Sequence, residues 1–480
     1  MKKAMLWKLF ERFGASAVQF VISLILARLL EPEHYGMLSI MIIFVSLANV
    51  LVQTGFNTSL IQGKEVTEED YSSVLWVSLL ATAVLYLAIF TGAPLIADIY
   101  HMPELIVPLR VIALVLFPGT VNSIQLAKAS REMNFKVIFI GTMVSTIISG
   151  AVGVAVAIMG GGVWALVIQQ IFGMLITCAV MAFLVDWKPR LVCNMVRVKV
   201  LIAYGWKLLA AGLMETLYQN LSSLVVGKKY DSGTLGYYNR GLNFPQFIIN
   251  AINGAVQSVL LPAMAAEQDD KAKVKQIMRG SVMLSSYLIF PAMAGLAAVA
   301  EPMVRLLLTD KWLPCVPYLQ VFCISFAFYP VHTSNLQAIN AVGRSDIYLK
   351  LEVAKKTVGI LALICAVFCF ETPVAIALSS VFTSIVSSFI NAFPNKKLIA
   401  YSYFEQMKDL VPALVMSVIM FVAVNPLCKL ALGPLAIIII QVVAGVAVYL
   451  LLSIALRIEP FILVKNMLLE TLRKRKSENS

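Results

Sequence analysis

Long apolar stretches recur along almost the whole chain and constrain its fold more than any other feature. A helix needs about 20 apolar residues to cross a bilayer. Hydrophobic residues make up 60% and charged residues 13% of the 480, whereas a soluble domain has nearer half and a quarter. The sequence therefore predicts an all-α, polytopic membrane protein with about 14 transmembrane helices. The predicted spans are residues 9–30, 36–61, 72–94, 104–126, 137–158, 162–185, 201–226, 236–264, 280–300, 314–340, 347–370, 373–393, 410–431 and 434–456.

The basic residues predict how these spans are oriented. An even number of crossings puts both termini on one side, and cytoplasmic loops carry an excess of Lys and Arg. With both termini in the cytoplasm, most of the 38 Lys and Arg residues fall at cytoplasmic ends. The net charge of +12 is then mostly a topology signal, and we expect no nucleic-acid partner. The start of the chain has no signal-peptide cleavage pattern, so we expect the first apolar run to be retained.

An internal repeat divides the chain into two related parts. Residues 26–36 align without gaps with residues 226–236, with Gly36 on Gly236. Six spans followed by six related spans indicate a parallel duplication about an axis along the membrane normal. The predicted parts are an N-terminal six-helix lobe (1–185), a cytoplasmic linker (186–200), a C-terminal six-helix lobe (201–399), two additional transmembrane helices (400–457) and a basic cytoplasmic tail (458–480). We expect the tail to lie against anionic headgroups.

Amide side chains form a ladder within the eighth predicted span. They are Asn239, Asn243, Gln246, Asn250, Asn253 and Gln257. Spacings of three and four residues keep all six on one face of a helix. Asn and Gln are costly in hydrocarbon unless they face protein or water. The ladder is therefore either a helix–helix contact or the wall of a polar cavity.

Similar but thinner polar stripes follow three other spans. The first span carries Arg12, Ser16, Gln19 and Ser23; the second carries Ser39, Ser46, Gln53 and Asn57; the seventh carries Glu215, Thr216, Gln219, Asn220, Ser222 and Ser223. Together with the eighth span, they are the first two spans of each half. Helix–helix bonds, worth about 0.6 kcal/mol each, would be spread over many interfaces. Concentration on four related spans favours a cavity, although interhelical contacts remain the alternative.

Cations near the span ends provide candidate phosphate ligands, because Arg and Lys bind phosphate oxygens. They are Arg12, Lys128, Arg131, Lys207, Arg240, Lys355 and Lys356. Snorkelling to the membrane surface explains most of them equally well. Glu215 stands out as the acid well inside a predicted span, where it is either a proton or cation coupling site or the partner of a cation such as Lys207 or Arg12.

Metal and cofactor chemistry finds no support in the sequence. The seven cysteines show no paired metal spacing, and the three histidines are scattered. No GxxxxGK[ST] motif is present, which excludes a fused ATPase. We expect no catalytic residues, no metal and no cofactor.

Several segments resemble the polysaccharide transporter family of Wzx-type oligosaccharide flippases, specifically its colanic-acid and teichuronic-acid exporter branch. They are residues 11–36, 53–62, 131–136, 160–166, 225–245 and 260–270. The resemblance implies a multidrug/oligosaccharidyl-lipid/polysaccharide exporter fold, with two six-helix lobes around a central cavity. It also implies transport of undecaprenyl-diphosphate-linked oligosaccharides across the bacterial cytoplasmic membrane. Polysaccharide polymerase and glycosyltransferases are the expected partners besides the bilayer.

We therefore predict a non-enzymatic flippase for surface polysaccharide synthesis that works by alternating access. A drug–cation antiporter on the same fold is the first alternative. An integral-membrane polysaccharide polymerase or ligase is a weaker alternative, because the outer loops are short. The candidate cavity residues are Arg12, Ser16, Gln19, Gln53, Glu215, Gln219, Asn239, Arg240, Asn243, Gln246, Asn250, Asn253 and Gln257.

Overall fold

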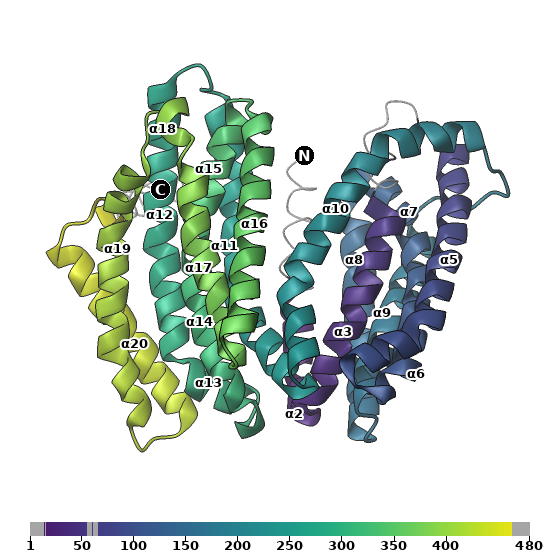
Figure 1. The fold of residues 1–480 in the computed structure, drawn as a ribbon, viewed down its shortest axis with the longest axis horizontal. Helices are drawn as coiled ribbons and strands as arrows, with labels where there is room; N and C mark the ends of the chain where they lie inside the picture. The colour runs from purple at the N-terminus through teal and green to yellow at the C-terminus, as the bar shows by residue number, and fades with distance from the viewer. Residues whose placement is uncertain (1–13, 15, 55–59, 61–65, 463–480) are drawn as a thin grey trace, which may run out of the picture. The chain divides into compact units, whose positions relative to one another are not determined.

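The chain is all-α, as predicted. A computed structural model describes residues 14, 16–54, 60 and 66–462, and this part contains helices and connecting turns without a β-strand (Figure 1). The helices before residue 190 are α2 (Ser16–Leu29), α3 (Pro32–Asn49), η2 (Val50–Thr54), α5 (Glu68–Tyr100), η3 (Pro103–Leu105), α6 (Ile106–Ile112), η4 (Ala113–Val115), α7 (Leu116–Arg131), α8 (Phe135–Ile158) and α9 (Val163–Leu184). Those after it are α10 (Met195–Lys229), α11 (Ser232–Ala265), α12 (Lys271–Ala298), α13 (Ala300–Leu307), η5 (Asp310–Cys315), α14 (Val316–Ala327), α15 (Tyr329–Ala341), α16 (Ser345–Cys369), α17 (Pro373–Ala392), α18 (Asn395–Leu398), α19 (Tyr403–Val424), η6 (Asn425–Lys429) and α20 (Pro434–Ala455).

The predicted spans coincide with these helices. Among the described residues, 11 helical segments are long and apolar enough to cross a membrane. The three other predicted spans correspond to α2, α10 and α16. Helix α2 is described only from Ser16, and α10 and α16 carry several polar and charged side chains. The protein is therefore a multi-pass membrane protein, while the number fourteen stays a prediction.

Two compact units make up the chain, Met1–Asn239 and Arg240–Ser480. Helix α10 follows the predicted linker but packs against α3, η2 and α5, so it belongs to the first unit. The boundary between the units falls inside α11. The predicted division into lobes 1–185 and 201–399 rests on the repeat and stays a prediction.

The predicted linker is bound to α5 in the first unit. The indole nitrogen of Trp76 donates a hydrogen bond to the carbonyl oxygen of Arg190 over 2.8 Å. The amides of Arg190 and Asn194 donate to the hydroxyls of Ser72 and Ser73 over 3.1 and 2.9 Å. Because unpaired backbone groups are costly where water is excluded, these bonds give the connection a fixed path along α5.

Each unit has its own apolar core. In the first unit, Tyr71, Ile124 and Trp187 belong to a core between α5, α7, α8 and α9. In the second unit, Phe290, Val331 and Tyr401 belong to a core between α11, α12, α15 and α19.

Three fully buried amides bind one another beside the second core. Asn335 (α15) donates from Nδ2 to Gln406 Oε1 over 2.8 Å, and Gln406 (α19) donates from Nε2 to Asn335 Oδ1 over 3.0 Å. Asn395 (α18) donates to the same Asn335 oxygen over 2.7 Å. All three side chains have 0% exposure, and a buried amide is stabilising only when it is paired. This amide triad joins α15, α18 and α19.

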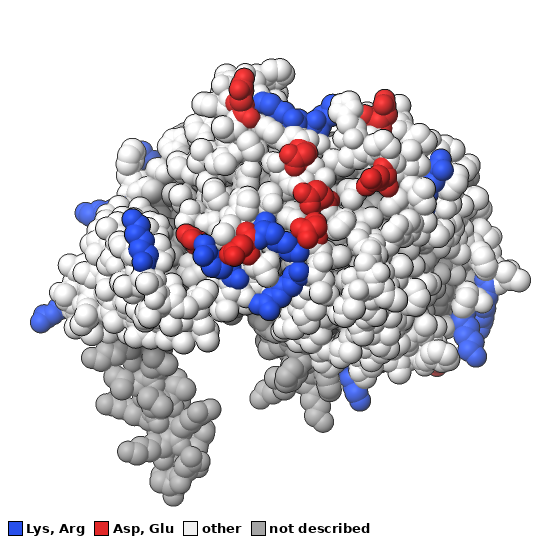
Figure 2. Space-filling model, turned by 90° about the horizontal axis from the view of Figure 1, so that it is seen from below, with Lys and Arg blue, Asp and Glu red and all other residues white. Residues whose placement is uncertain are grey.

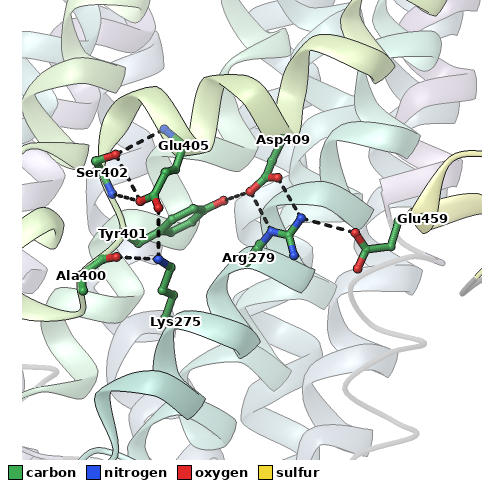
Figure 3. Close-up of polar contacts among 8 residues, drawn as sticks. All are labelled: Lys275, Arg279, Ala400, Tyr401, Ser402, Glu405, Asp409 and Glu459. Atoms are coloured by element: carbon green, nitrogen blue, oxygen red, sulfur yellow. Dashed lines mark hydrogen bonds and ion pairs between the residues drawn. The ribbon is translucent and has the colours of Figure 1, made fainter.

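A group of ion pairs attaches α19 to α12 (Figure 3). The Arg279 guanidinium forms two parallel hydrogen bonds with the Asp409 carboxylate, Nε to Oδ2 at 2.9 Å and Nη2 to Oδ1 at 3.0 Å. Glu459 accepts a further bond from Arg279 at 3.3 Å. The Tyr401 hydroxyl donates to Asp409 over 2.7 Å, and burial together with this bond raises the pKa of Tyr401. Bidentate geometry makes this one of the stronger kinds of ion pair.

We expect Asn335→Ala to lower the stability of the second unit. The substitution leaves the buried amides of Gln406 and Asn395 without their partner, at a cost of about 1–3 kcal/mol. The midpoint of thermal unfolding in detergent measures the effect. Asn340→Ala, on the same helix but exposed, is the control and should leave the midpoint unchanged; equal effects of the two variants would contradict a stabilising role for the triad.

Candidate functional site

The amide ladder lies on α11, and four of its six members form an exposed face. Asn243, Gln246, Asn250 and Gln257 are exposed, whereas Phe244, Ile249 and Leu260 of the same helix are buried. None of the four amides forms a hydrogen bond within the part of the chain that the structure describes. Each therefore offers both a donor and an acceptor to a polar ligand. We call these four residues the amide face.

The other two members of the ladder bind neighbouring helices. Asn239 Oδ1 accepts a hydrogen bond from the Ser223 hydroxyl of α10 over 2.9 Å, within the first unit. Asn253 Oδ1 accepts from the Thr333 hydroxyl of α15 over 2.7 Å, within the second unit. Thr333 is buried. These two amides therefore make interhelical contacts, while the cavity interpretation of the other four stays a prediction.

Glu215 and Gln219 lie together on α10. Gln219 Nε2 donates to Glu215 Oε1 over 2.7 Å, as an i,i+4 pair on one helix face. Gln219 is exposed and Glu215 is half-buried. The cations considered as partners of Glu215 are Arg12, which lies outside the described residues, and Lys207, whose side chain is likewise not described.

The polar stripe of the first span is partly exposed where the structure describes it. Ser16 and Gln19 on α2 are both exposed, and the Ser23 hydroxyl donates to the carbonyl oxygen of Phe20 over 2.8 Å. Helix α2 packs against α8 within the first unit. Ser16 and Gln19 therefore lie at the surface of the first unit, as predicted residues whose role stays a prediction.

Gln53 lies in a different setting from the exposed amides. It is half-buried in the π-helical segment η2, and its Nε2 donates to Asn49 Oδ1 over 2.9 Å. A methyl group added to Gly119 of α7 would lie 3.4 Å from Gln53 Nε2. Gln53 and Asn49 thus fill a contact between α3, η2 and α7. Sequence reasoning did not include Asn49, although its spacing of four residues from Gln53 pointed to it.

Arg240 is buried in the second unit rather than exposed on the amide face. Its guanidinium carbon lies 5.1 Å from the centre of the Trp312 ring, and Trp312 has 0% exposure. The next residue, Gly241, lies against Cys315 and Leu319, where an added methyl group would come within 3.0 Å of backbone atoms. This close approach of α11 to η5 and α14 sets the position of Arg240. The surroundings favour a packing role over phosphate binding.

Three of the other candidate cations have partners inside their own unit. Lys128, which is buried, donates to Glu68 over 2.6 Å and to the carbonyl oxygen of Asp186 over 2.8 Å. Arg131 donates to the carbonyl oxygen of Leu60. Lys355 binds Glu352 over 2.5 Å on α16. Glu352 is a second acid inside a predicted span, which sequence reasoning missed; its spacing of three residues from Lys355 indicated the pair.

Metal binding has no support from the described part of the chain, where no three His, Cys, Asp or Glu side chains come together to hold an ion. The chemistry that these side chains provide is hydrogen bonding by amides and hydroxyls, with two acids that are already hydrogen-bonded.

Comparisons with known proteins place this arrangement in a class. A solved structure titled as the lipid II flippase MurJ in an inward closed conformation matches with a TM-score of 0.75 over 94% of this chain and 99% of that one, at 15% sequence identity. An inward-facing multidrug resistance MATE family transporter of the MOP superfamily matches with a TM-score of 0.61 over 79% and 95%, at 12% identity. The fold is therefore that of multi-pass membrane transporters.

The sequence identifies the family within that class. The sequence model of the family described as "Polysaccharide biosynthesis protein" matches residues 25–317, more than half of the chain. This protein belongs to that family, which confirms the resemblance found in the sequence. It is 27% identical to the lipopolysaccharide biosynthesis protein WzxC of Escherichia coli over 73% of this chain and 71% of that one. It is 23% identical to the succinoglycan biosynthesis transport protein ExoT of Rhizobium meliloti over 71% and 69%.

We expect Asn253 and Asn250 to differ in their effect on stability. Asn253→Leu leaves the buried Thr333 hydroxyl without its partner, so it should destabilise the protein by about 1 kcal/mol. Thr333→Val should cost a similar amount, and the double variant should cost less than the sum because one bond is lost in all three.

Asn250→Leu is the matched control, because Asn250 is exposed. It should leave the midpoint of thermal unfolding in detergent unchanged. An equal loss of stability in Asn250→Leu would show that the amide face is itself a helix–helix contact.

Proposed function

We propose that the protein is a flippase that moves undecaprenyl-diphosphate-linked oligosaccharide units across the bacterial cytoplasmic membrane for surface polysaccharide synthesis. The observation that supports this most directly is the amide face of α11. Four exposed amides on one side of a long apolar helix provide donors and acceptors for a ligand rich in hydroxyl groups. The same residues facing only lipid would be strongly unfavourable.

The comparisons agree with this proposal. Two relatives carry names that refer to biosynthesis of lipopolysaccharide and to transport in succinoglycan biosynthesis, and a third is named as a teichuronic acid biosynthesis protein. The structure with the TM-score of 0.75 is titled as a lipid II flippase. The relatives' names refer to polysaccharides, which fits a ligand rich in hydroxyl groups, and the flippase title supports our inference that the saccharide is lipid-linked.

In the proposed cycle, the oligosaccharide enters a polar passage lined by the exposed amides and hydroxyls. The polyprenyl chain stays in the bilayer, so only the polar part of the substrate leaves water. Both termini face the cytoplasm in this proposal, and glycosyltransferases and a polymerase act before and after transport. Alternating access of the passage to the two sides carries the unit across without chemical change, and no catalytic residue is required.

A drug–cation antiporter on the same fold would need acidic and aromatic residues in the passage. Two acids inside predicted spans, Glu215 and Glu352, are hydrogen-bonded to Gln219 and Lys355. The exposed polar side chains of α11 are amides. Sugar is therefore better supported as the ligand than an organic cation.

We expect Gln246→Leu combined with Asn250→Leu to abolish export, because two rungs of the amide face lose their hydrogen-bonding groups. In a deletion strain complemented with the variant, surface polysaccharide should fall to background, and lipid-linked oligosaccharide should accumulate on the cytoplasmic side of the membrane. Asn340→Leu, an exposed amide on α15, is the control. Normal export by the double variant at normal protein levels would refute the role of the amide face.

Arg12 provides a separate test of diphosphate binding. It begins the polar stripe of the first predicted span, and the proposal assigns it to phosphate oxygens. Arg12→Ala should abolish export while the protein remains in the membrane. Lys3→Ala, a cation outside the predicted span, should have no effect. Full export by the Arg12→Ala variant would exclude Arg12 as a phosphate ligand.

A further inference from the structure

Two turns that are equivalent in the internal repeat have equivalent structures. The turn between α2 and α3 is followed by a helix beginning at Pro32, and the turn between α10 and α11 is followed by a helix beginning at Ser232. Gly36 and Gly236 therefore occupy the same position in the first turns of α3 and α11. Both turns lie in the first compact unit.

These two turns contact each other in a reciprocal way. A Cβ atom built on Gly36 would lie 1.8 Å from the carbonyl oxygen of Ser232, and one built on Gly236 would lie 2.1 Å from the carbonyl oxygen of Pro32. Real Cβ atoms essentially never come within 3.0 Å of another atom in this way. Gly36 thus contacts Ser232, and Gly236 contacts Pro32, which is the repeat equivalent of Ser232. This is the pattern of a contact around a local two-fold axis.

A second pair of equivalent residues, at the starts of the two helices, also lies in contact. Gly233 is the repeat equivalent of Glu33, and a Cβ atom on Gly233 would lie 3.0 Å from Glu33 Oε1. Behind the turns, a Cβ atom on Gly227 would lie 3.1 to 3.4 Å from Leu235, Tyr100 and Ile40. We call the backbone contact between the two turns the glycine joint. It closes over an apolar layer in which Leu235 and Ile40 have 0% exposure.

Charged side chains surround the glycine joint. Arg28, Glu31, Glu33, Lys228, Lys229 and Asp231 are exposed. Figure 2 views the molecule from the end that carries these turns and shows acidic and basic side chains interspersed there. The closest contact of the joint is backbone against backbone, and exposed charges form its rim.

We propose that Gly36 and Gly236 are positioning residues for transport, because they allow the first and second halves of the repeat to close to backbone contact on the predicted outer side of the membrane. The joint opens and re-forms once in each transport cycle. This inference rests on the proposed function, and it adds which residues set the closed position. Any side chain at either glycine props the joint open.

Alanine substitutions test the requirement for close approach. We expect Gly36→Ala and Gly236→Ala each to lower export of surface polysaccharide at least about tenfold, because overpacking by one methyl group displaces the backbone. Gly92→Ala and Gly280→Ala are matched controls, since a Cβ atom at either position meets nothing within 4 Å. Normal export by both variants of the joint would overturn the proposal.

A labelling measurement separates an opened joint from a misfolded protein. Leu235→Cys places a thiol in the apolar layer behind the joint, and a membrane-impermeant maleimide added from outside probes its access. Site-specific labelling, read by mass spectrometry, should be low in the parent and rise in combination with Gly36→Ala. Unchanged labelling in that combination would show that the glycine does not set closure.

Cross-linking tests whether the joint must open. Glu33→Cys combined with Gly233→Cys should be joined by a short, reducible bis-methanethiosulfonate reagent, while either single variant should not. Export should stop on cross-linking and recover on reduction. A cross-linked protein that exports normally would make the joint a permanent contact and overturn this inference, while leaving the flippase proposal intact. Unchanged polysaccharide in the deletion strain would instead refute the flippase proposal, without affecting the cross-link itself.

Discussion

The cost of leaving a polar group without a partner away from water decides where this chain places its polar side chains. In hydrocarbon that cost amounts to several kcal/mol for each backbone group, so helices supply their own hydrogen bonds and polar side chains need partners or water. The side chains of the amide triad, Asn335, Gln406 and Asn395, are fully buried and hydrogen-bonded to one another, and only Asn395 Oδ1 lacks a partner among the described residues of the triad. The four residues of the amide face take the opposite solution and remain exposed. Both kinds of amide occur in the second unit. This unit therefore can supply hydrogen-bond partners to amides, and the exposure of the amide face needs another explanation.

The sequence predicted the helices well because their lengths and apolar content follow directly from bilayer thickness. Each predicted span overlaps one or more of the described helices, and the amide periodicity placed Asn243, Gln246, Asn250 and Gln257 on one side of α11 as expected. Periodicity shows which face a residue occupies but not which helix lies opposite. For this reason the ladder looked uniform in the sequence, although Asn239 and Asn253 bind Ser223 and Thr333. The Asn335 triad escaped prediction because its members are separated in sequence.

The internal repeat shows the same limit of sequence patterns. Aligning residues 26–36 with 226–236 places Gly36 on Gly236, which predicts similar local structure at both sites. Nothing in the alignment indicates that the two sites touch. The contact arises from the packing of α10 against α3 and α5 in the first unit, which brings the start of α11 to the start of α3. This contact explains why both Gly36 and Gly236 lack a side chain, because a Cβ atom at either position would overlap the other turn.

The charges complete the contrast between structural and functional polar groups. The net charge of +12 would make an anionic substrate attractive if the cations were available. Several of them are already engaged within their own unit, since Lys128 binds Glu68, Lys355 binds Glu352, and Arg279 binds Asp409. Removing such a cation would leave an acid without its partner, so its loss would mainly affect stability. Neutral amides do not have to neutralise a charged partner, and they bind hydroxyl groups without the desolvation cost of a full charge. A passage lined by amides therefore suits a bulky neutral saccharide that has to be released again on the other side.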